Sequence, residues 1–268
     1  MKDVKSVSFA AGCVLAMVLT FSCSSDDGGN GKIVYGSPVT YEGKTYQTVI
    51  IGTQTWMAEN LNYAAVGSKC YGEDGPVVID DENDDHNRIT KTLSNAEVQA
   101  NCDKYGRLYD WPTAMALPSS CNSDFCSDQI QSPHRGICPV GWHIPNDDDW
   151  NKLFRYVDNE NGGSGEEDEE TGIYVSYTAG KHLKATSGWN SRDGVSGNGT
   201  DKYGFRALPG GAGKNGNFSG EGGGGIWRNT SEGASRVRTY SPGIEPGDGV
   251  RWAGDPKSSL WSVRCVKD

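Results

Sequence analysis

Apolar residues recur at helical spacing most clearly in the middle of the chain. Trp150, Leu153, Phe154 and Val157 stand at positions i, i+3, i+4 and i+7, so one face of a helix would carry all four. Asn146 can accept hydrogen bonds from the free N–H groups at the helix start, and the three Asp residues after it suit the positive end of the helix dipole. We predict that a helix begins at Asn146 and packs its apolar face against the rest of the domain.

Short β-branched and aromatic runs, punctuated by glycine, predict antiparallel strands before this helix, in residues 39–41, 44–51 and 54–57. Between these strands and the helix, Ser94 and Glu97 form a capping box that predicts a short helix ending at Gly106. Residues 178–184 are expected to form one more short helix. Apolar and polar residues alternate from 260 to 266, which predicts a half-buried strand.

Glycine dominates the chain after Trp189. Nine of the sixteen residues from Gly210 to Gly225 are glycine. This composition is typical of long connecting loops, because glycine brings no side chain to a packed core. We therefore predict a glycine-rich loop region here, with strand material returning at residues 225–227, 235–240 and 259–266.

The first 22 residues have the pattern of a secretory signal peptide. Lys2 and Lys5 precede an apolar run from Val7 to Phe21 that is too short to span a membrane. The run ends in a sequence that resembles a bacterial lipobox, and we predict that Cys23 becomes the acylated first residue, with a plain secreted protein as the alternative. Residues 23–37 then form a Ser/Asp/Gly tether and residues 38–268 the domain. The expected location is the outer membrane, at the cell surface, with the lipid as the only membrane contact.

Six of the eight cysteines remain in the domain once Cys13 and Cys23 are set aside. An even number of cysteines in an exported chain predicts three disulfides, and fifteen pairings are possible. The spacing does not match a structural zinc site, because neither C-x-x-C nor H-x-x-x-H occurs. We favour the pairing Cys70–Cys102, Cys121–Cys126 and Cys138–Cys265.

Charge argues against nucleic acid as a partner. The whole chain carries a formal net charge of −10, and loss of Lys2, Asp3 and Lys5 with the signal removes a net +1 and leaves −11. Nucleic acid and anionic membranes require clustered cations.

The acidic run at residues 80–85 fails as an EF-hand loop, because His86 and Thr92 replace the required Gly and Glu. This run and residues 166–170 are expected to be solvated acidic loops.

Five motifs occur together and in order in the domain, at residues 54–63, 105–111, 136–150, 203–211 and 262–266. They read QTWMAENLNY, YGRLYDW, GICPVGWHIP followed by Trp150, YGFRALPGG, and SVRCV. Together they resemble the Fibrobacter succinogenes major paralogous domain, found in exported proteins and lipoproteins, over residues 35–268. Residues 144–150 and the Arg264-Cys265 ending are also similar to the formylglycine-generating, sulfatase-modifying family.

The second resemblance implies an α+β, C-type-lectin-like fold with short antiparallel strands, two or three helices and long glycine-rich loops. Two departures limit what it implies about activity. The sulfatase-modifying enzymes need a reactive cysteine pair late in the chain, and here Cys265 stands alone after Cys138. Residues 245–248 and 252–255 come nearest to the calcium motifs of lectins but lack their amides. We expect no cofactor and no metal, with calcium as the alternative.

Catalytic motifs are not recognisable in the sequence. The four histidines lie apart from any known nucleophile motif, and His143 is expected to be structural. Trp56, Trp111, Trp142 and Trp150 lie in the motifs and are expected to fill the core. We therefore expect a binding protein rather than an enzyme.

A ligand site is expected in the loops between residues 189 and 256. If tryptophans there are exposed beside polar residues, they would form a platform that stacks sugar rings. The candidate ligand-binding residues are Trp189, Trp227, Arg228, Asn229, Arg251, Trp252 and Asp255. The expected partner is a plant polysaccharide or another surface protein; a diverged sulfatase-modifying enzyme and a structural scaffold are the alternatives.

Overall fold

The computed structural model describes residues 32–81 and 84–268, with side chains for all of them except residues 80–87. The chain divides into Met1–Asn30 and Gly31–Asp268, and the second unit is described here. It is an α+β structure with few helices and short, mostly antiparallel strands. The predicted signal peptide, Cys23 and most of the predicted tether lie outside the described residues.

Four α-helices occur in the described part of the chain, at α1 (Asn95–Tyr105), α2 (Trp111–Met115), α3 (Asp147–Asn161) and α4 (Ala179–Leu183), together with two short 3-10 helices at Ser119–Asn122 and Ser127–Gln129. The predicted starts of α1 and α3 are confirmed, because Ser94 and Asn146 both form capping boxes. In α3 the predicted apolar face is buried. The helix α2 was not predicted; Asp110 caps it and Pro112 stands in its first turn.

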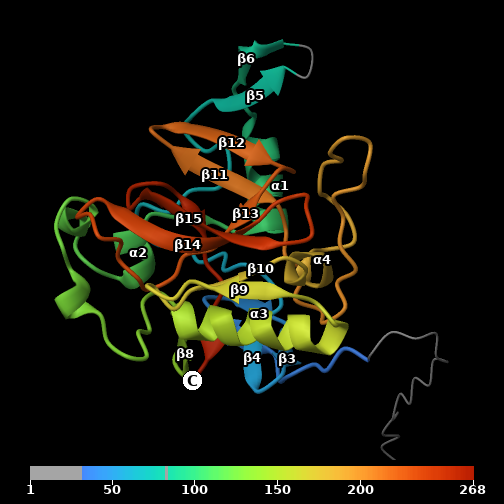
Figure 1. The fold of residues 1–268 in the computed structure, drawn as a ribbon. Coiled ribbons are helices and arrows are strands. Elements are labelled where there is room, and N and C mark those ends of the chain that lie inside the picture. The colour runs from blue at the N-terminus through green and yellow to red at the C-terminus, as the bar shows by residue number, and fades with distance from the viewer. Residues whose placement is uncertain (1–31, 82–83) are drawn as a thin grey trace, which may run out of the picture. The chain divides into compact units, whose positions relative to one another are not determined.

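The central sheet has the strand order β3 (Thr48–Ile51), β4 (Gln54–Met57), β17 (Val266–Lys267), β8 (Trp142–His143). The last strand of the chain therefore lies between one of the first strands and the strand before α3 (Figure 1). Residues 34–36 already pair with β3, so the ordered domain begins before the predicted boundary at residue 38. Trp56 of β4 contacts Trp150 of α3, with ring centroids 4.7 Å apart, at the centre of the main core.

Two further sheets and three strand pairs complete the domain. One sheet has the order β11 (Gly210–Lys214), β12 (Asn217–Glu221), β5 (Val77–Asp81), β6 (Asp84–Lys91), and the other joins β13 (Gly225–Ile226), β14 (Arg238–Ile244) and β15 (Val250–Pro256). The pairs are β1 (Val39–Tyr41) with β2 (Lys44–Tyr46), β9 (Gly165–Glu167) with β10 (Tyr174–Ser176), and β16 (Trp261–Ser262) with β7 (Leu108–Tyr109). The β5–β6 hairpin projects from the body of the domain (Figure 1).

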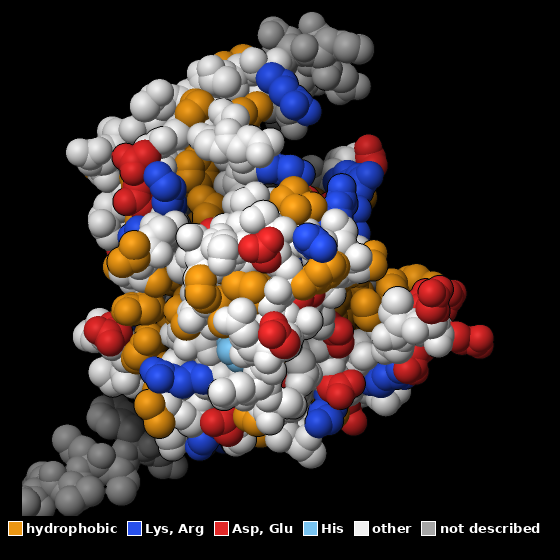
Figure 2. All heavy atoms as spheres, turned by 90° about the vertical axis from the view of Figure 1, so that its left-hand side faces the viewer, with side chains coloured by type: hydrophobic (Ala, Val, Ile, Leu, Met, Phe, Trp, Pro, Cys, Tyr) orange, Lys and Arg blue, Asp and Glu red, His pale blue; other side chains and the backbone are white. Residues whose placement is uncertain are grey.

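The three disulfides have the predicted pairing, Cys70–Cys102, Cys121–Cys126 and Cys138–Cys265. The last of them joins residues 127 positions apart and attaches the C-terminal segment to the segment that leads into β8. The six cysteine side chains of these disulfides are buried. Seen from the α2 side, the surface carries hydrophobic side chains gathered in the middle of the face, with charged side chains scattered around them (Figure 2).

The prediction of a long connecting loop is wrong for residues 210–221, which form the β11–β12 hairpin. Asn215 and Gly216 form its turn, and both have positive φ angles, of 52° and 77°. An Asn-Gly pair favours this type of turn because both central residues must adopt the left-handed conformation. Gly213 allows close packing, since a Cβ there would lie 2.9 Å from the side chain of Leu260.

The expectation of solvated acidic loops is also corrected at residues 166–170. Glu166 and Glu167 belong to β9, and Asp168 accepts hydrogen bonds in the turn that leads to β10. The acidic side chains therefore belong to an ordered hairpin. For the run at residues 80–85 the side chains lie outside the described set; the backbone of residues 80 and 81 belongs to β5 and that of residues 84 and 85 to β6.

Buried cations hold the loops that surround the central sheet. Arg264 is fully buried where a half-buried strand was predicted, and residues 261–266 are all buried. Its guanidinium donates to Asn60 Oδ1 at 2.7 Å and to the backbone carbonyls of Phe205 and Arg206. Its charge lies over the Phe205 ring, 4.2 Å from the centroid. The alternation in the sequence failed here because the guanidinium satisfies carbonyls inside the protein.

Candidate functional site

Two hollows border the β9–β10 hairpin and share no lining residue. The larger one, with a volume of about 630 Å³, is an open groove beside the N-terminal half of α3. The smaller one, of about 290 Å³, lies between the end of β10 and the turn that joins β14 to β15. Figure 1 shows the hairpin running alongside α3. The hairpin is thus a shared wall between the two.

The groove is lined mainly by side chains that form hydrogen bonds. Five of them come from α3 at positions that share one face of the helix over about 12 Å. The lining residues are Asn146, Asp147, Asp148, Asn151, Lys152, Arg155, Glu167, Thr171, Gly172 and Ser231. Three carboxylates, two cations, two amides and two hydroxyls therefore face one open space.

Asp147 connects α3 to the loop on the far side of the groove. Its carboxylate accepts hydrogen bonds from the Asn229 amide and from Ser231 Oγ, the latter at 2.6 Å. Burial raises the pKa of Asp147, and the two hydrogen bonds act in the opposite direction. Asp148, the next residue, is exposed. Asp147 therefore shapes the floor of the groove, whereas Asp148 is free to meet a ligand.

Arg155 closes the other end of the groove. Its guanidinium pairs with Glu167 of β9 and lies over the ring of Tyr174 at 4.3 Å from the centroid. Asn151, one turn earlier on the helix, donates to the carbonyl of Gly172 and accepts from the N–H of Tyr174, both at 2.8 Å. These contacts hold the hairpin against α3 and keep the groove open between them.

Four of the seven predicted ligand-binding residues are buried, and the prediction is wrong for them. Trp189, Trp227, Arg228 and Asn229 are each at most 5% exposed. The Trp189 indole donates to the carbonyl of Ala207 and the Trp227 indole to Asn60, both inside the core. A glycine-rich segment has few apolar side chains of its own, so its tryptophans are needed to fill the space over the sheet.

Arg228 has a structural role like that of Arg264. It donates to the backbone carbonyls of Tyr109, Lys257 and Ser259, and its charge lies over the ring of Trp261 at 4.6 Å. Burial lowers the pKa of Arg228 to about 9, which leaves the group charged at neutral pH. Its side chain therefore ties strand β7 to the segment at residues 257–259 and does not reach the surface.

The other three predicted residues lie on β15 and are at least partly exposed. Trp252 donates to the carbonyl of Tyr174 at 3.0 Å and so fixes β10 against β15. Asp255 pairs with Lys214 at 3.0 Å. Arg251 pairs with Glu245 and lines the smaller hollow. The structure thus separates the seven residues, and of these it places Arg251 at an open cavity.

His143 is held between two carboxylates. Nδ1 lies 2.7 Å from Asp268 and Nε2 lies 3.1 Å from Asp149, and the imidazole is buried. Burial favours the neutral ring, but the hydrogen bonds to Asp149 and Asp268 outweigh it and raise the pKa of His143. Both ring nitrogens are engaged within the protein. A structural role agrees with these contacts, as expected from the sequence.

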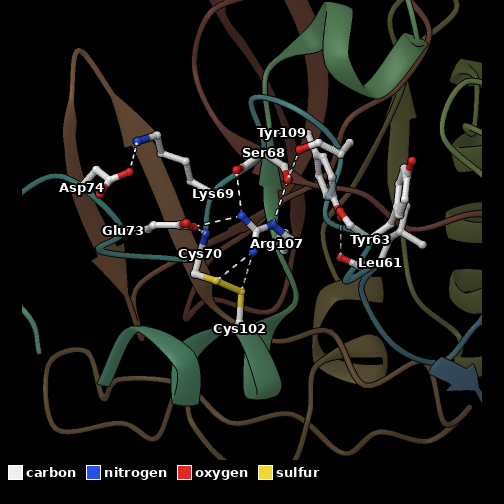
Figure 3. A network of polar contacts seen from close by, with 11 residues as sticks. Leu61, Tyr63, Ser68, Lys69, Cys70, Glu73, Asp74, Cys102, Arg107 and Tyr109 are labelled. Carbon is white, nitrogen blue, oxygen red and sulfur yellow. Dashed lines mark hydrogen bonds and ion pairs between the residues drawn. A yellow bond between two sulfur atoms is a disulfide. The ribbon is translucent and has the colours of Figure 1, made fainter. Parts of the chain in front are cut away.

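Arg107 organises a second polar network, around the disulfide Cys70–Cys102 (Figure 3). Its guanidinium donates to the carbonyl and the hydroxyl of Ser68, each at 2.8 Å, and pairs with Glu73 at 3.0 Å. It also approaches Cys70 Sγ at 3.3 Å. The network fixes the loop before β5 and leaves Lys69 and Glu73 at the rim of a small hollow of about 180 Å³.

Residues 32–81 and 84–268 contain no group of three or more His, Cys, Asp or Glu side chains that could hold a metal ion. Among the same residues, the helices are too short or too polar to cross a membrane. The groove beside α3 was missed from the sequence, because its residues were explained by the helix start. Polar residues recur at helical spacing at positions 147, 148, 151, 152 and 155, and this spacing could have predicted a polar face on the helix.

Comparison with known proteins gave one match. The model of the Fibrobacter succinogenes major domain matches residues 49–267, which include all five motifs, the central sheet except Thr48, and every residue that lines the two hollows. No curated protein and no solved structure matches the chain. The match covers most of the chain, and the protein belongs to the Fibrobacter succinogenes major domain family.

Proposed function

We propose that this protein is a cell-surface binding module without catalytic activity, and that its groove beside α3 binds a polysaccharide. The observation that carries the proposal is the lining of the groove, an open space of about 630 Å³ edged by amides, hydroxyls and charges of both signs. A polysaccharide presents many hydroxyl groups, each able to donate and accept. Such a surface pairs well with a mixed set of donors and acceptors.

The charges of the groove favour a ligand without strong charge. Asp147, Asp148 and Glu167 are nearly balanced by Lys152 and Arg155. A nucleic acid would need a surplus of cations, which the groove does not offer. Another surface protein remains the second expected partner, and the experiment below distinguishes it from a glycan.

Location and fold complete the proposal. The signal-like first 22 residues and the lipobox-like ending at Cys23 support export and lipidation at Cys23, with attachment to the outer membrane at the cell surface. A C-type-lectin-like fold is supported by the pairing of β17 with β4, the two longer helices α1 and α3, and the extended loop region between them and the C-terminal strand. Both are proposals that rest on these features.

The absence of catalysis is supported by how the reactive groups are used. The six cysteines from Cys70 to Cys265 are joined in disulfides, so they offer no thiolate for the chemistry of the sulfatase-modifying enzymes. His143 has both nitrogens occupied by carboxylates. These groups hold the fold together.

Retention of the full-length protein on insoluble plant polysaccharides tests the proposal. The variant Asp148→Ala/Lys152→Ala removes two exposed side chains from the groove, and we expect its retention to fall about ten-fold, as loss of roughly 1.4 kcal/mol of binding free energy requires. The matched control Asn159→Ala/Glu160→Ala changes two exposed residues at the other end of α3 and should bind normally.

Two results would contradict the proposal. Failure of the wild-type protein to bind any polysaccharide would exclude the glycan and leave a surface protein as the ligand to be sought. Equal retention of the groove variant and the control would move glycan binding away from α3.

A further inference from the structure

The smaller hollow differs from the groove in its lining. Apolar surface from Val175, Tyr177 and Val250 forms much of it, and two arginines and one glutamate stand around it. The two spaces share no lining residue. Its chemistry can therefore be considered separately from that of the groove.

Tyr177 presents an aromatic surface at this hollow. Tyr177 is 48% exposed. The Glu166 carboxylate raises the pKa of Tyr177, so the phenol stays neutral at physiological pH. A neutral, exposed ring is thus available to a ligand at this hollow.

The β14–β15 turn leaves space beside this ring. Gly249 lies against the end of β10, where a Cβ would come within 2.8 Å of the carbonyl of Ser176. Gly247 borders open space, with no atom within 4 Å of the position that its Cβ would take. The buried Lys184 donates hydrogen bonds to the carbonyls of Pro246 and Gly247, each at 2.8 Å, and so fixes the turn. The hollow thus has a fixed rim and an open centre.

Positive charge exceeds negative charge in the lining. Arg251 is paired with Glu245, whereas the Arg192 side chain makes no hydrogen bond or ion pair with another residue of the described chain. Two guanidinium groups against one carboxylate leave a surplus of one positive charge, in a chain whose net charge is −10. Nearby acidic groups are engaged elsewhere, Glu166 with Tyr177 and Asp248 with Lys181.

We infer that this hollow binds an acidic sugar residue, a uronate, through its carboxylate and its ring. A guanidinium forms two parallel hydrogen bonds with a carboxylate, and Arg192 is available for that role. The apolar face of a sugar ring packs on an exposed aromatic ring such as that of Tyr177. A volume of about 290 Å³ suits one or two sugar units. An acidic peptide would satisfy the arginine but would leave the ring of Tyr177 without a partner.

Calorimetric titration of the full-length protein with a galacturonic acid trisaccharide tests the inference, with the neutral galactose trisaccharide as the matched ligand. We expect the acidic trisaccharide to bind at least ten-fold more tightly and its affinity to fall as salt is added. Arg192→Gln should remove this preference, and Tyr177→Ala should weaken binding of both ligands.

Equal affinity for the two trisaccharides, or an unchanged preference in Arg192→Gln, would overturn the inference. A hexaglutamate peptide that bound as tightly as the acidic trisaccharide would also overturn it, in favour of a peptide ligand. The groove variant Asp148→Ala/Lys152→Ala serves as the second control and should bind the acidic trisaccharide normally. Failure of the groove proposal would therefore show in that variant's retention on polysaccharide, and failure of this inference would show in Arg192→Gln.

Discussion

The layer formed by α3 and the central sheet is held together differently from the glycine-rich segments around it. In the first region, Trp56, Trp150 and Phe154 pack ring against ring, with centroids 4.7 and 5.6 Å apart. In the second, buried cations bind backbone carbonyls, as Arg264 does for residues 205 and 206 and Lys184 for residues 245–247. Loops leave carbonyls without partners in a sheet or helix, and a buried guanidinium satisfies several of them at once.

The difference shows how a segment with so few apolar side chains can be ordered. Four cations, Arg228, Arg264, Lys257 and Lys184, are each at most 1% exposed. Each lies over an aromatic ring, at 4.2 to 5.3 Å from the centroid. Trp189, which was expected to bind sugar, is one of these rings. It therefore helps to hold the loops in place.

Arg264→Met offers the strongest way to break this arrangement. The change keeps the volume of the side chain but leaves the carbonyls of Phe205 and Arg206 without this donor and leaves Asn60 Oδ1 with the Trp227 indole alone, so we expect the free energy of unfolding to fall by about 3–5 kcal/mol. Urea unfolding followed by tryptophan fluorescence measures it.

Arg238→Met is the matched control for this variant. Arg238 also donates to a backbone carbonyl, that of Gly254 at 3.0 Å, but it is exposed. Its loss should cost less than about 0.5 kcal/mol. Similar losses in the two variants would contradict the idea that burial of the cation is what orders the loops.

A pair of tryptophan variants compares the two regions more directly. The indole N–H of Trp227 donates to Asn60 at 2.9 Å, whereas that of Trp150 has no partner among the described residues. Both side chains are buried to 1% exposure. We expect Trp227→Phe to cost about 1 kcal/mol more than Trp150→Phe, the net value of one buried hydrogen bond. Equal losses in urea unfolding would show that packing alone decides both sites.

The sequence predicted the first region far better than the second. The apolar face of α3, its cap at Asn146 and the strands β3 and β4 follow local rules of spacing and capping. The three disulfides have the favoured pairing, one of the fifteen that six cysteines allow. The β11–β12 hairpin could have been predicted from Asn215-Gly216, but its glycine content suggested a loop. The positions of Arg228 and Arg264 could not, because their partners are carbonyls of residues that are distant in the sequence.

The candidate site divides in the same way. The groove residues from Asp147 to Arg155 are close in sequence, so their shared face follows from the helix that was predicted. The smaller hollow combines residues near positions 177, 192 and 247, and only the folded loops bring them together. Arg251 was predicted as a ligand-binding residue because it is a polar residue near a tryptophan; its place beside this hollow was not predicted.

The smallest expected effect is a pH dependence that arises in the layer of α3 and the central sheet. The buried cations of the other region do not add to it near neutral pH, because burial lowers the pKa values of Arg228 and Arg264 only to about 9. In His143 the hydrogen bonds to Asp149 and Asp268 outweigh burial, so its pKa in the folded state lies above its value in the unfolded chain. The protonated imidazole therefore stabilises the fold below the unfolded pKa, and this contribution is lost as pH rises through the folded pKa.

We expect the free energy of unfolding to fall by up to about 1 kcal/mol between pH 6 and pH 8.5, the value of a partly exposed ion pair. His143→Gln keeps a side chain that can donate to one carboxylate but cannot titrate, so it should remove this slope.

On the acidic side, hydrogen bonds from His143 and Asn146 lower the pKa of Asp149 despite its burial. The stabilisation from Asp149 is therefore present above its unfolded pKa and is lost as pH falls through its folded pKa. Urea unfolding at several pH values measures both limbs. A slope that survived in His143→Gln would assign the pH dependence to a group outside the layer of α3 and the central sheet.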